Sequence, residues 1–260
     1  MTRHPATDRL LLAGAAAGLA LGSVGVTACG DEAGSGTREL TVFAASSLTE
    51  AFTEIGEAFH AAHPDVKVSF SFAGSGDLVA QLGEGAPADV LATADEANMA
   101  KAVEAGTVVG DPVLVATNTF GIIVGPGNPN AVNGLADLAD PSLLVVLCAD
   151  SVPCGTGAAA VLENAGVSVA PVSYEEKVKG VVTKVTSGEA DAGIVFVTDI
   201  AAAGSSAVGV EIPADVNVVT SYPIAVTKDA PNAADAATFV EFVASNEGRA
   251  ILESFGFGLP

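Results

Sequence analysis

The stretch LTVFAASSLTEAF, residues 40–52, passes from one hydrophobic pattern to another at a pair of serines. Residues 40–44 are an apolar run typical of a buried strand, and from Leu48 onward the apolar residues have the spacing of a helix. Ser46 and Ser47 stand between the two patterns, and the stretch contains no Lys or Arg. Since the first N–H groups of a helix have no partner within it, this turn predicts a place that favours a bound anion.

The same order, a short apolar run followed by a helix pattern, continues to the end of the chain and predicts an α/β fold with mostly parallel sheets. Apolar runs predict strands at 39–44, 66–72, 90–94, 119–124, 143–149, 192–197 and 223–226. One helix face is predicted for Leu48, Ala51, Phe52, Ile55, Phe59 and Ala62, and another for Val178, Val181, Val182 and Val185. Further helices are predicted at 77–82, 96–105, 157–165 and in a closing pair around Phe239 and Ile251.

Composition limits the class of protein. The chain has 260 residues, 50% of them hydrophobic, and a formal charge of −21. Without Arg3, Arg9 and Asp8, the charged residues of the N-terminal segment 1–29, the formal charge becomes −22. Such an excess of negative charge argues against nucleic acid or an anionic membrane surface as a partner. The length is sufficient for one large core or two modest ones.

The N-terminus has the pattern of an export signal. Residues 1–9 are basic, and residues 10–26 are apolar but too short and glycine-rich for a membrane span. The sequence VTAC, which ends at Cys29, resembles the lipobox of bacterial lipoproteins, in which that cysteine carries lipid. We therefore expect a signal peptide at 1–28, a lipid anchor at Cys29 and a flexible tether at 29–38, with a plain signal peptide as the alternative.

Four loops of small residues each precede a predicted helix: 44–48, 73–78, 152–157 and the approach to the helix that holds Val178. A single serine at such a place is usually a helix cap, and a single glycine-rich loop is usually a turn. Several such loops after strands can meet at the carboxyl ends of the sheets, where α/β folds bind ligands. Together they predict an anion site made of hydroxyl and backbone N–H groups.

Cys148 and Cys154, in CADSVPC, are the cysteines that follow the N-terminal segment. In an exported protein, cysteines this close together indicate a small-loop disulfide, with a pair of buried thiols as the alternative. A free Cys154 at a helix start would have a lowered thiol pKa and could serve a thiol-dependent enzyme. A disulfide would remove that function.

The histidines give little support to an enzyme or a metal site. His60 and His63, in FHAAH, have a spacing that can bind a metal, but no third ligand is evident and a solvated helix end explains them equally. No other histidine follows the N-terminal segment, so a Ser or Cys triad lacks a base. The sequence therefore predicts no catalytic residue, no cofactor and no protein-bound metal.

Five segments together resemble a known family. VFAASSLTEAF, FAGSGDLVAQLGEGAPADVLATAD, DSVPCG, GIVFVTD and SYPIAV occur in the order and spacing of the molybdate-binding proteins of bacterial ABC importers. This resemblance covers nearly the whole chain after the N-terminal segment. It implies a two-lobed periplasmic-binding-protein fold of type II, with two crossing strands and a ligand cleft between the lobes. The first lobe would comprise 39–117 and 221–260, and the second lobe 118–220.

The resemblance also implies a ligand and the residues that hold it. The ligand would be molybdate or tungstate, delivered to an ABC permease by a monomeric, lipid-anchored extracytoplasmic protein. The positions that match the family's oxyanion donors are Ser47, Ser75, Cys154 and Val178, the last two donating through the backbone. Candidates for additional contacts are Ser46, Gly74, Phe196, Thr198 and Tyr222.

Phe196 departs from the family pattern. Many members have a tyrosine at this position, in GIVY, and its phenol donates to the anion, whereas a phenylalanine has no donor. Either one anion oxygen has a partner fewer, or Thr198 or Tyr222 supplies the missing hydroxyl.

Neutral donors also select among anions. Molybdate, tungstate and sulfate only accept hydrogen bonds at neutral pH, whereas phosphate keeps a proton and needs an acceptor, which Ser47, Ser75, Cys154 and Val178 do not offer as a carboxylate. Phosphate is therefore disfavoured, and a binding protein for sulfate or another small oxyanion is the alternative within the class. A surface adhesin and the thiol-dependent enzyme using Cys154 are the alternatives from other classes.

Overall fold

The structure of the chain is a computed structural model, which describes residues 37–260. The predicted signal peptide 1–28, the lipidation site Cys29 and nearly all of the predicted tether 29–38 lie outside the described residues. Strand β1 begins at Arg38, one residue before the predicted strand and at the last residue of the predicted tether. In the described range, no helix has both the length and the apolar character that a membrane crossing requires.

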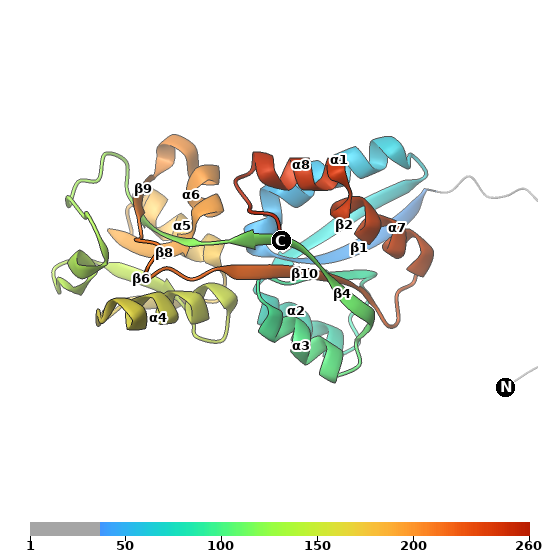
Figure 1. Cartoon of the computed structure of the whole chain (residues 1–260), viewed down its shortest axis with the longest axis horizontal. Helices are drawn as coiled ribbons and strands as arrows, with labels where there is room; N and C mark the ends of the chain where they lie inside the picture. Colours follow the sequence, from blue (N-terminus) through green and yellow to red (C-terminus); the bar gives the residue numbers. More distant parts are fainter. Residues whose placement is uncertain (1–36) are drawn as a thin grey trace, which may run out of the picture. The chain divides into compact units, whose positions relative to one another are not determined.

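Five strands form the first sheet, in the order β2-β1-β3-β10-β4. They are β1 (Arg38–Ala45), β2 (Val66–Ala73), β3 (Val90–Ala92), β4 (Val108–Asn118) and β10 (Thr220–Thr227). The helices grouped with this sheet are α1 (Thr49–Ala62), α2 (Ser75–Gly83), α3 (Glu96–Glu104), α7 (Ala233–Ala244) and α8 (Asn246–Ser254). We call this sheet with its helices the first lobe (Figure 1).

The second sheet also has five strands, in the order β7-β6-β8-β5-β9. They are β5 (Phe120–Val124), β6 (Val145–Cys148), β7 (Ser173–Glu175), β8 (Ala192–Phe196) and β9 (Val208–Glu211). Helices α4 (Pro153–Ala165), α5 (Val178–Ser187) and α6 (Val197–Ala203) pack against it, and we call this group the second lobe. Short 3-10 helices are η1 (Ser46–Leu48), η2 (Leu135–Ala139) and η3 (Gly204–Ser206).

Both sheets are mixed. In the first sheet β1 is parallel to β2 and β3, whereas β10 is antiparallel to β3 and β4. In the second sheet β6 is parallel to β7 and β8, whereas β5 is antiparallel to β8 and β9. The sheets are therefore less parallel than predicted, because β4 leads the chain from the first lobe to the second and β10 returns beside it in the opposite direction (Figure 1).

Helix α1 packs the face predicted from its spacing into the core of the first lobe. Phe52, Ile55 and Phe59 are fully buried, and the ring of Phe59 meets that of Phe239 in α7 edge to face, with centroids 5.2 Å apart. The prediction is wrong for Ala62, which is exposed because it is the last residue of the helix. Burial of these aromatic rings anchors α1, and with it the serine turn that precedes it.

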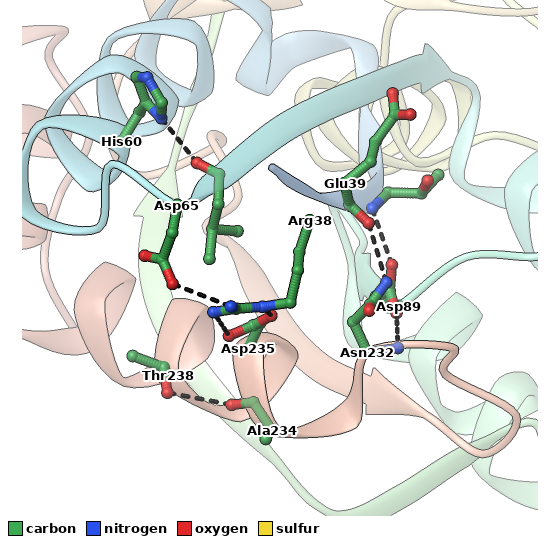
Figure 2. A network of polar contacts seen from close by, with 11 residues as sticks. Arg38, Glu39, His60, Asp65, Asp89, Asn232, Ala234, Asp235 and Thr238 are labelled. Atoms are coloured by element: carbon green, nitrogen blue, oxygen red, sulfur yellow. Dashed lines mark hydrogen bonds and ion pairs between the residues drawn. The ribbon is translucent and has the colours of Figure 1, made fainter. Parts of the chain in front are cut away.

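A polar network fixes the start of β1, at the end of the strand that lies away from the turn with Ser46 and Ser47 (Figure 2). Arg38 donates from Nε to Asp235 of α7 at 2.7 Å and forms an ion pair with Asp65 at 2.9 Å. The buried Asp89, just before β3, accepts from a backbone N–H of β1 at 2.8 Å and from that of Asn232 at 2.6 Å. These contacts tie β1 and β3 to α7, across long separations in sequence.

The sequence did not predict β4, β7, β9 or α6. Strand β4 contains Gly110 and Pro112, which are typical of turns, and its pairing with β10 has two register shifts. Strands β7 and β9 are short and lie at the edges of the second sheet. Helix α6 begins at the residue after β8, so its apolar residues read as a continuation of that strand.

Candidate anion-binding site

A small cavity lies where four turns from the two lobes meet. Its lining consists of Ala45, Ser46, Ser47, Ala73, Gly74, Ser75, Ala94, Val152, Pro153, Cys154, Lys177, Val178 and Phe196. The four predicted oxyanion donors, Ser47, Ser75, Cys154 and Val178, are all among them. The volume open to the centre of a water molecule is about 10 Å³, so the lobes are closed tightly around the site in this conformation.

The turn after β1 presents two buried serines, Ser46 and Ser47, and neither caps the helix that follows. The ordinary role of a serine at a helix start is to accept from a backbone N–H as the N-cap. Here Ala45 is the N-cap of η1, and the Ser47 hydroxyl lies 3.1 Å from the hydroxyl of Tyr222. The Ser47 side chain therefore serves a contact other than capping.

The turn after β2 requires a glycine because the two lobes approach closely there. A Cβ on Gly74 would lie 2.5 Å from the carbonyl oxygen of Glu176 in the second lobe. The next residue, Ser75, begins α2 and is 1% exposed. Its Oγ accepts from the backbone N–H of Ala94 at 3.0 Å, so the hydroxyl hydrogen is left for another acceptor.

A disulfide between Cys148 and Cys154 joins the end of β6 to the first turn of α4. Because Pro153, the first residue of α4, has no N–H, the first N–H of this helix belongs to Cys154. Gly155 allows the loop to close beneath the helix start, since a Cβ there would lie 1.9 Å from the carbonyl oxygen of Ala149. With both sulfurs in the disulfide, the alternative of a thiol-dependent enzyme using Cys154 is wrong.

Helix α5 contributes a further N-terminus to the cavity. Its first residue is the buried Val178, and its N-cap Lys177 has extended backbone and makes no side-chain cap bond. Lys177 is a cation among the lining residues, but as a residue it is exposed. The α5 end of the cavity thus offers backbone N–H groups and the positive end of a helix dipole.

Phe196 lines the cavity, whereas the two residues expected to replace its missing hydroxyl do not. Its ring centroid lies 4.8 Å from that of Phe120 and 6.0 Å from that of Tyr222. Tyr222 and Thr198 are buried behind the lining, where Asn118 Nδ2 donates to Thr198 Oγ1 at 2.8 Å. Asn118 was not predicted, because nothing in the sequence near it indicates that β4 ends beside the site.

Three charged side chains join α1, α5 and α6 next to the cavity. Lys179 Nζ lies 2.7 Å from Glu50 Oε2 in the first lobe and 2.9 Å from Asp199 Oδ1 in the second. Burial raises the pKa of Asp199 to about 6, and the Lys179 ammonium offsets only part of that rise. Burial by itself lowers the pKa of Lys179, but Asp199 and Glu50 outweigh it and the pKa is raised. This triad was missed because its members are distant in sequence.

The two histidines have ordinary structural contacts. A ring nitrogen of His60 lies 2.7 Å from the carbonyl oxygen of Val66, and the ring of His63 packs on Phe59 with centroids 4.5 Å apart. Among the described residues, no group of three or more His, Cys, Asp or Glu side chains could hold a metal ion.

These features define a class of protein. Two α/β lobes, joined by the crossing strands β4 and β10, together line a site of neutral hydrogen-bond donors, which is the arrangement of an extracytoplasmic solute-binding protein. The chain belongs to the family of bacterial extracellular solute-binding proteins, whose family model matches residues 40–258. Members of this family capture solutes and are not enzymes.

Individual relatives agree with this family. The molybdate-binding protein ModA of Mycobacterium tuberculosis is 43% identical over 244 residues, which cover 91% of this chain and 94% of the relative. The periplasmic molybdate-binding protein of Azotobacter vinelandii has a TM-score of 0.71 at 23% identity, over 85% of this chain and 99% of that one. The sulfate-binding protein SubI of M. tuberculosis has a TM-score of 0.75 at 18% identity, over 85% and 86%. The latter two similarities support the two-lobed fold.

Proposed function

We propose that the protein captures molybdate, and tungstate as well, outside the cytoplasm and delivers it to the permease of an ABC importer. The observation that carries this proposal is the convergence of Ser47, Ser75, Cys154 and Val178 from four separate turns on one cavity. The 43% identity to a molybdate-binding protein over nearly the whole chain supports the choice of ligand.

Neutral donors can hold a dianion without a counterion. A buried dianion with no partners would be very unfavourable, and each hydrogen bond to a charged group contributes about 1.5 to 3 kcal/mol. The cavity is lined by the serines Ser46, Ser47 and Ser75 and by the N-termini of α2, α4 and α5, whose backbone N–H groups and dipoles favour negative charge. No Asp or Glu lines it within the described chain, so a protonated anion such as hydrogen phosphate finds no carboxylate to accept its proton.

Ligand capture is proposed to close the two lobes, 39–117 with 221–260 and 118–220. A ligand that contacts both lobes stabilises the closed form over the open one, and the permease can distinguish the two. The Lys179 to Glu50 ion pair joins the lobes in the same conformation. We further propose that the protein is a monomer, anchored to the membrane by lipid on Cys29.

Thermal unfolding of residues 30–260 in the presence of single anions tests the function. Millimolar molybdate and tungstate should each raise the melting temperature, because a ligand at about 100 times its Kd adds about 2.7 kcal/mol to the free energy of unfolding. Hydrogen phosphate should give no shift. If none of the oxyanions shifts the transition, the proposed function is wrong and a role such as adhesion takes its place.

Sulfate is the second candidate ligand. It is acceptor-only like molybdate, and the fold is shared with a sulfate-binding protein. Calorimetric titration of sulfate and molybdate against the same protein separates the two: tighter binding of sulfate would replace molybdate as the ligand. The difference between them is one of size, since sulfate is the smaller tetrahedron.

A further inference from the structure

The Ser47 hydroxyl is connected to a buried chain of polar side chains at the crossing strands. Its Oγ lies 3.1 Å from the hydroxyl oxygen of Tyr222 in β10. Asn118, the last residue of β4, directs Nδ2 toward that same oxygen at 3.4 Å and toward Thr198 Oγ1 at 2.8 Å. All four side chains are buried, and only Ser47 lines the cavity.

The backbone fixes which way the Asn118 amide faces. The N–H of Thr119 donates to Asn118 Oδ1 at 2.9 Å, and a backbone N–H can only donate. If the amide were reversed, two donors would face each other at that position. Asn118 therefore presents its NH2 group, and not its oxygen, to Tyr222 and Thr198.

The orientation of Asn118 determines the direction of the next hydrogen bond. The buried Tyr222 hydroxyl hydrogen needs an acceptor, and since Asn118 presents only its NH2 group, Ser47 Oγ is the acceptor within reach in the described chain. Burial holds the pKa of Tyr222 well above its ordinary value, so the phenol keeps this proton. Ser47 Oγ thus accepts from Tyr222, and the Ser47 hydrogen is left to point into the cavity.

Ser75 is arranged in the same way by a different group. Its Oγ accepts from the backbone N–H of Ala94 at 3.0 Å, and the described residues offer its hydrogen no acceptor. Ser47 and Ser75, two of the three serines that line the cavity, thus each accept a hydrogen bond from a donor of the protein. Two unrelated contacts, one from β10 and one from the residues after β3, produce the same donor orientation.

We propose that Tyr222 and Asn118 are positioning residues of the anion site, which hold the Ser47 hydroxyl as a donor and thereby make the site selective for oxyanions that carry no proton. This inference rests on the proposed function and adds the reason for its selectivity. Tyr222 also compensates for the hydroxyl that Phe196 lacks. Its phenol acts through Ser47 instead of touching the ligand.

The substitution Tyr222→Phe tests the proposal, with Tyr174→Phe as its matched control. These are the two tyrosines of the chain, and Tyr174 is exposed on β7. Calorimetric titration should show molybdate binding about 3- to 10-fold weaker in Tyr222→Phe, the worth of one hydrogen bond, and unchanged in Tyr174→Phe. Hydrogen phosphate should lose less affinity than molybdate, or gain, because a Ser47 oxygen relieved of Tyr222 can accept its proton.

A double-mutant cycle separates positioning from packing. In a Ser47→Ala background there is no hydroxyl to orient, so Tyr222→Phe should have little further effect on molybdate affinity. An equal loss in both backgrounds would mean that Tyr222 acts through packing and would overturn the proposal. Should Tyr222→Phe fail to fold by circular dichroism, Asn118→Asp takes its place: it keeps the shape, turns the donor into an acceptor and should weaken binding more strongly.

The titration panel of molybdate, tungstate, sulfate and hydrogen phosphate keeps the two proposals distinct. If the unsubstituted protein binds sulfate best, the choice of molybdate fails, but a loss in Tyr222→Phe still supports the positioning role. If molybdate binds and Tyr222→Phe matches Tyr174→Phe, the positioning role alone fails. If the unsubstituted protein prefers hydrogen phosphate, or binds none of the four anions, both fail.

Discussion

Ser47 and Ser75 are the same residue type at equivalent turns, yet each depends on a different neighbour. Ser47 is oriented by the side chain of Tyr222, whereas Ser75 also satisfies the backbone N–H of Ala94. Removing the Ser75 hydroxyl leaves the buried N–H of Ala94 without its acceptor, and removing the Ser47 hydroxyl does the same to the buried O–H of Tyr222, so each loss carries a stability cost.

The first prediction concerns these hydroxyls. Ser47→Ala and Ser75→Ala should each weaken molybdate binding by about 1 to 3 kcal/mol, the contribution of a hydrogen bond to a charged group. Each substitution should also lower the free energy of unfolding, measured in urea, by about 1 to 3 kcal/mol, because each leaves one buried donor without an acceptor. The exposed Ser142→Ala is the control, and unchanged binding in both variants would remove these serines from the site.

The composition of the four loops predicted an anion site, and the family resemblance predicted Ser47, Ser75, Cys154 and Val178, which the structure brings to one cavity. Neither the loops nor the resemblance predicted the buried polar side chains behind the cavity lining. Asn118 lies on a strand that the sequence did not indicate, and its role depends on the direction of hydrogen bonds between residues far apart in the chain.

Among the elements, helices α1, α5 and α6 are linked by Lys179, which lies between Glu50 and the fully buried Asp199. Taking a carboxylate out of water has a free-energy cost, and one ammonium shared between two carboxylates offsets that cost only in part. The folded chain therefore binds a proton at Asp199 more readily than the unfolded chain does.

The second prediction is the pH dependence that follows. The pKa of Asp199 rises from 3.8 to about 6 on folding, so its contribution to stability is greatest below about pH 4 and is lost as the pH rises through about 6. The free energy of unfolding of the unsubstituted protein, relative to that of Asp199→Asn, should fall by up to about 3 kcal/mol between pH 4 and 7. Urea unfolding at each pH measures the difference.

A matched control for this experiment is Asp111→Asn, which removes an exposed carboxylate from β4. A substitution at such an exposed position should change the free energy of unfolding by no more than about 0.5 kcal/mol. If the difference in the free energy of unfolding between the unsubstituted protein and Asp199→Asn stays constant with pH, Asp199 has the same pKa in the folded and unfolded chains. If that difference grows as the pH rises, folding lowers the pKa of Asp199. Either result would contradict the prediction.

On the scale of the whole molecule, a formal charge of −21, which becomes −22 without residues 1–29, opposes the approach of a dianion to a site that has neutral donors. This repulsion acts over the Debye length, which falls from about 30 Å at 0.01 M salt to about 8 Å at 0.15 M. Once the anion is bound, the donors that contact it hold it in place. The overall charge therefore affects the rate of association more than the rate of dissociation.

The third prediction is that molybdate associates faster as NaCl is raised from 0.01 to 0.15 M, because screening removes part of the repulsion. Stopped-flow measurements can follow tyrosine emission, since the chain has 2 tyrosines and no tryptophan. Dissociation should change much less over the same range. A rate of association that stays constant or falls would mean that the local field at the cavity, and not the overall charge, controls capture.

Hydrophobic period and turn composition are local properties, so they predicted the α/β alternation, most strands and helices, and the four turns that bear hydroxyls or helix N-termini. The mixed sheets, the crossing path of β4 and the polar layer behind Ser47 are visible only in the folded chain. These depend on the direction in which strands return and on which buried groups meet, and a buried donor takes whichever acceptor the packing brings within reach.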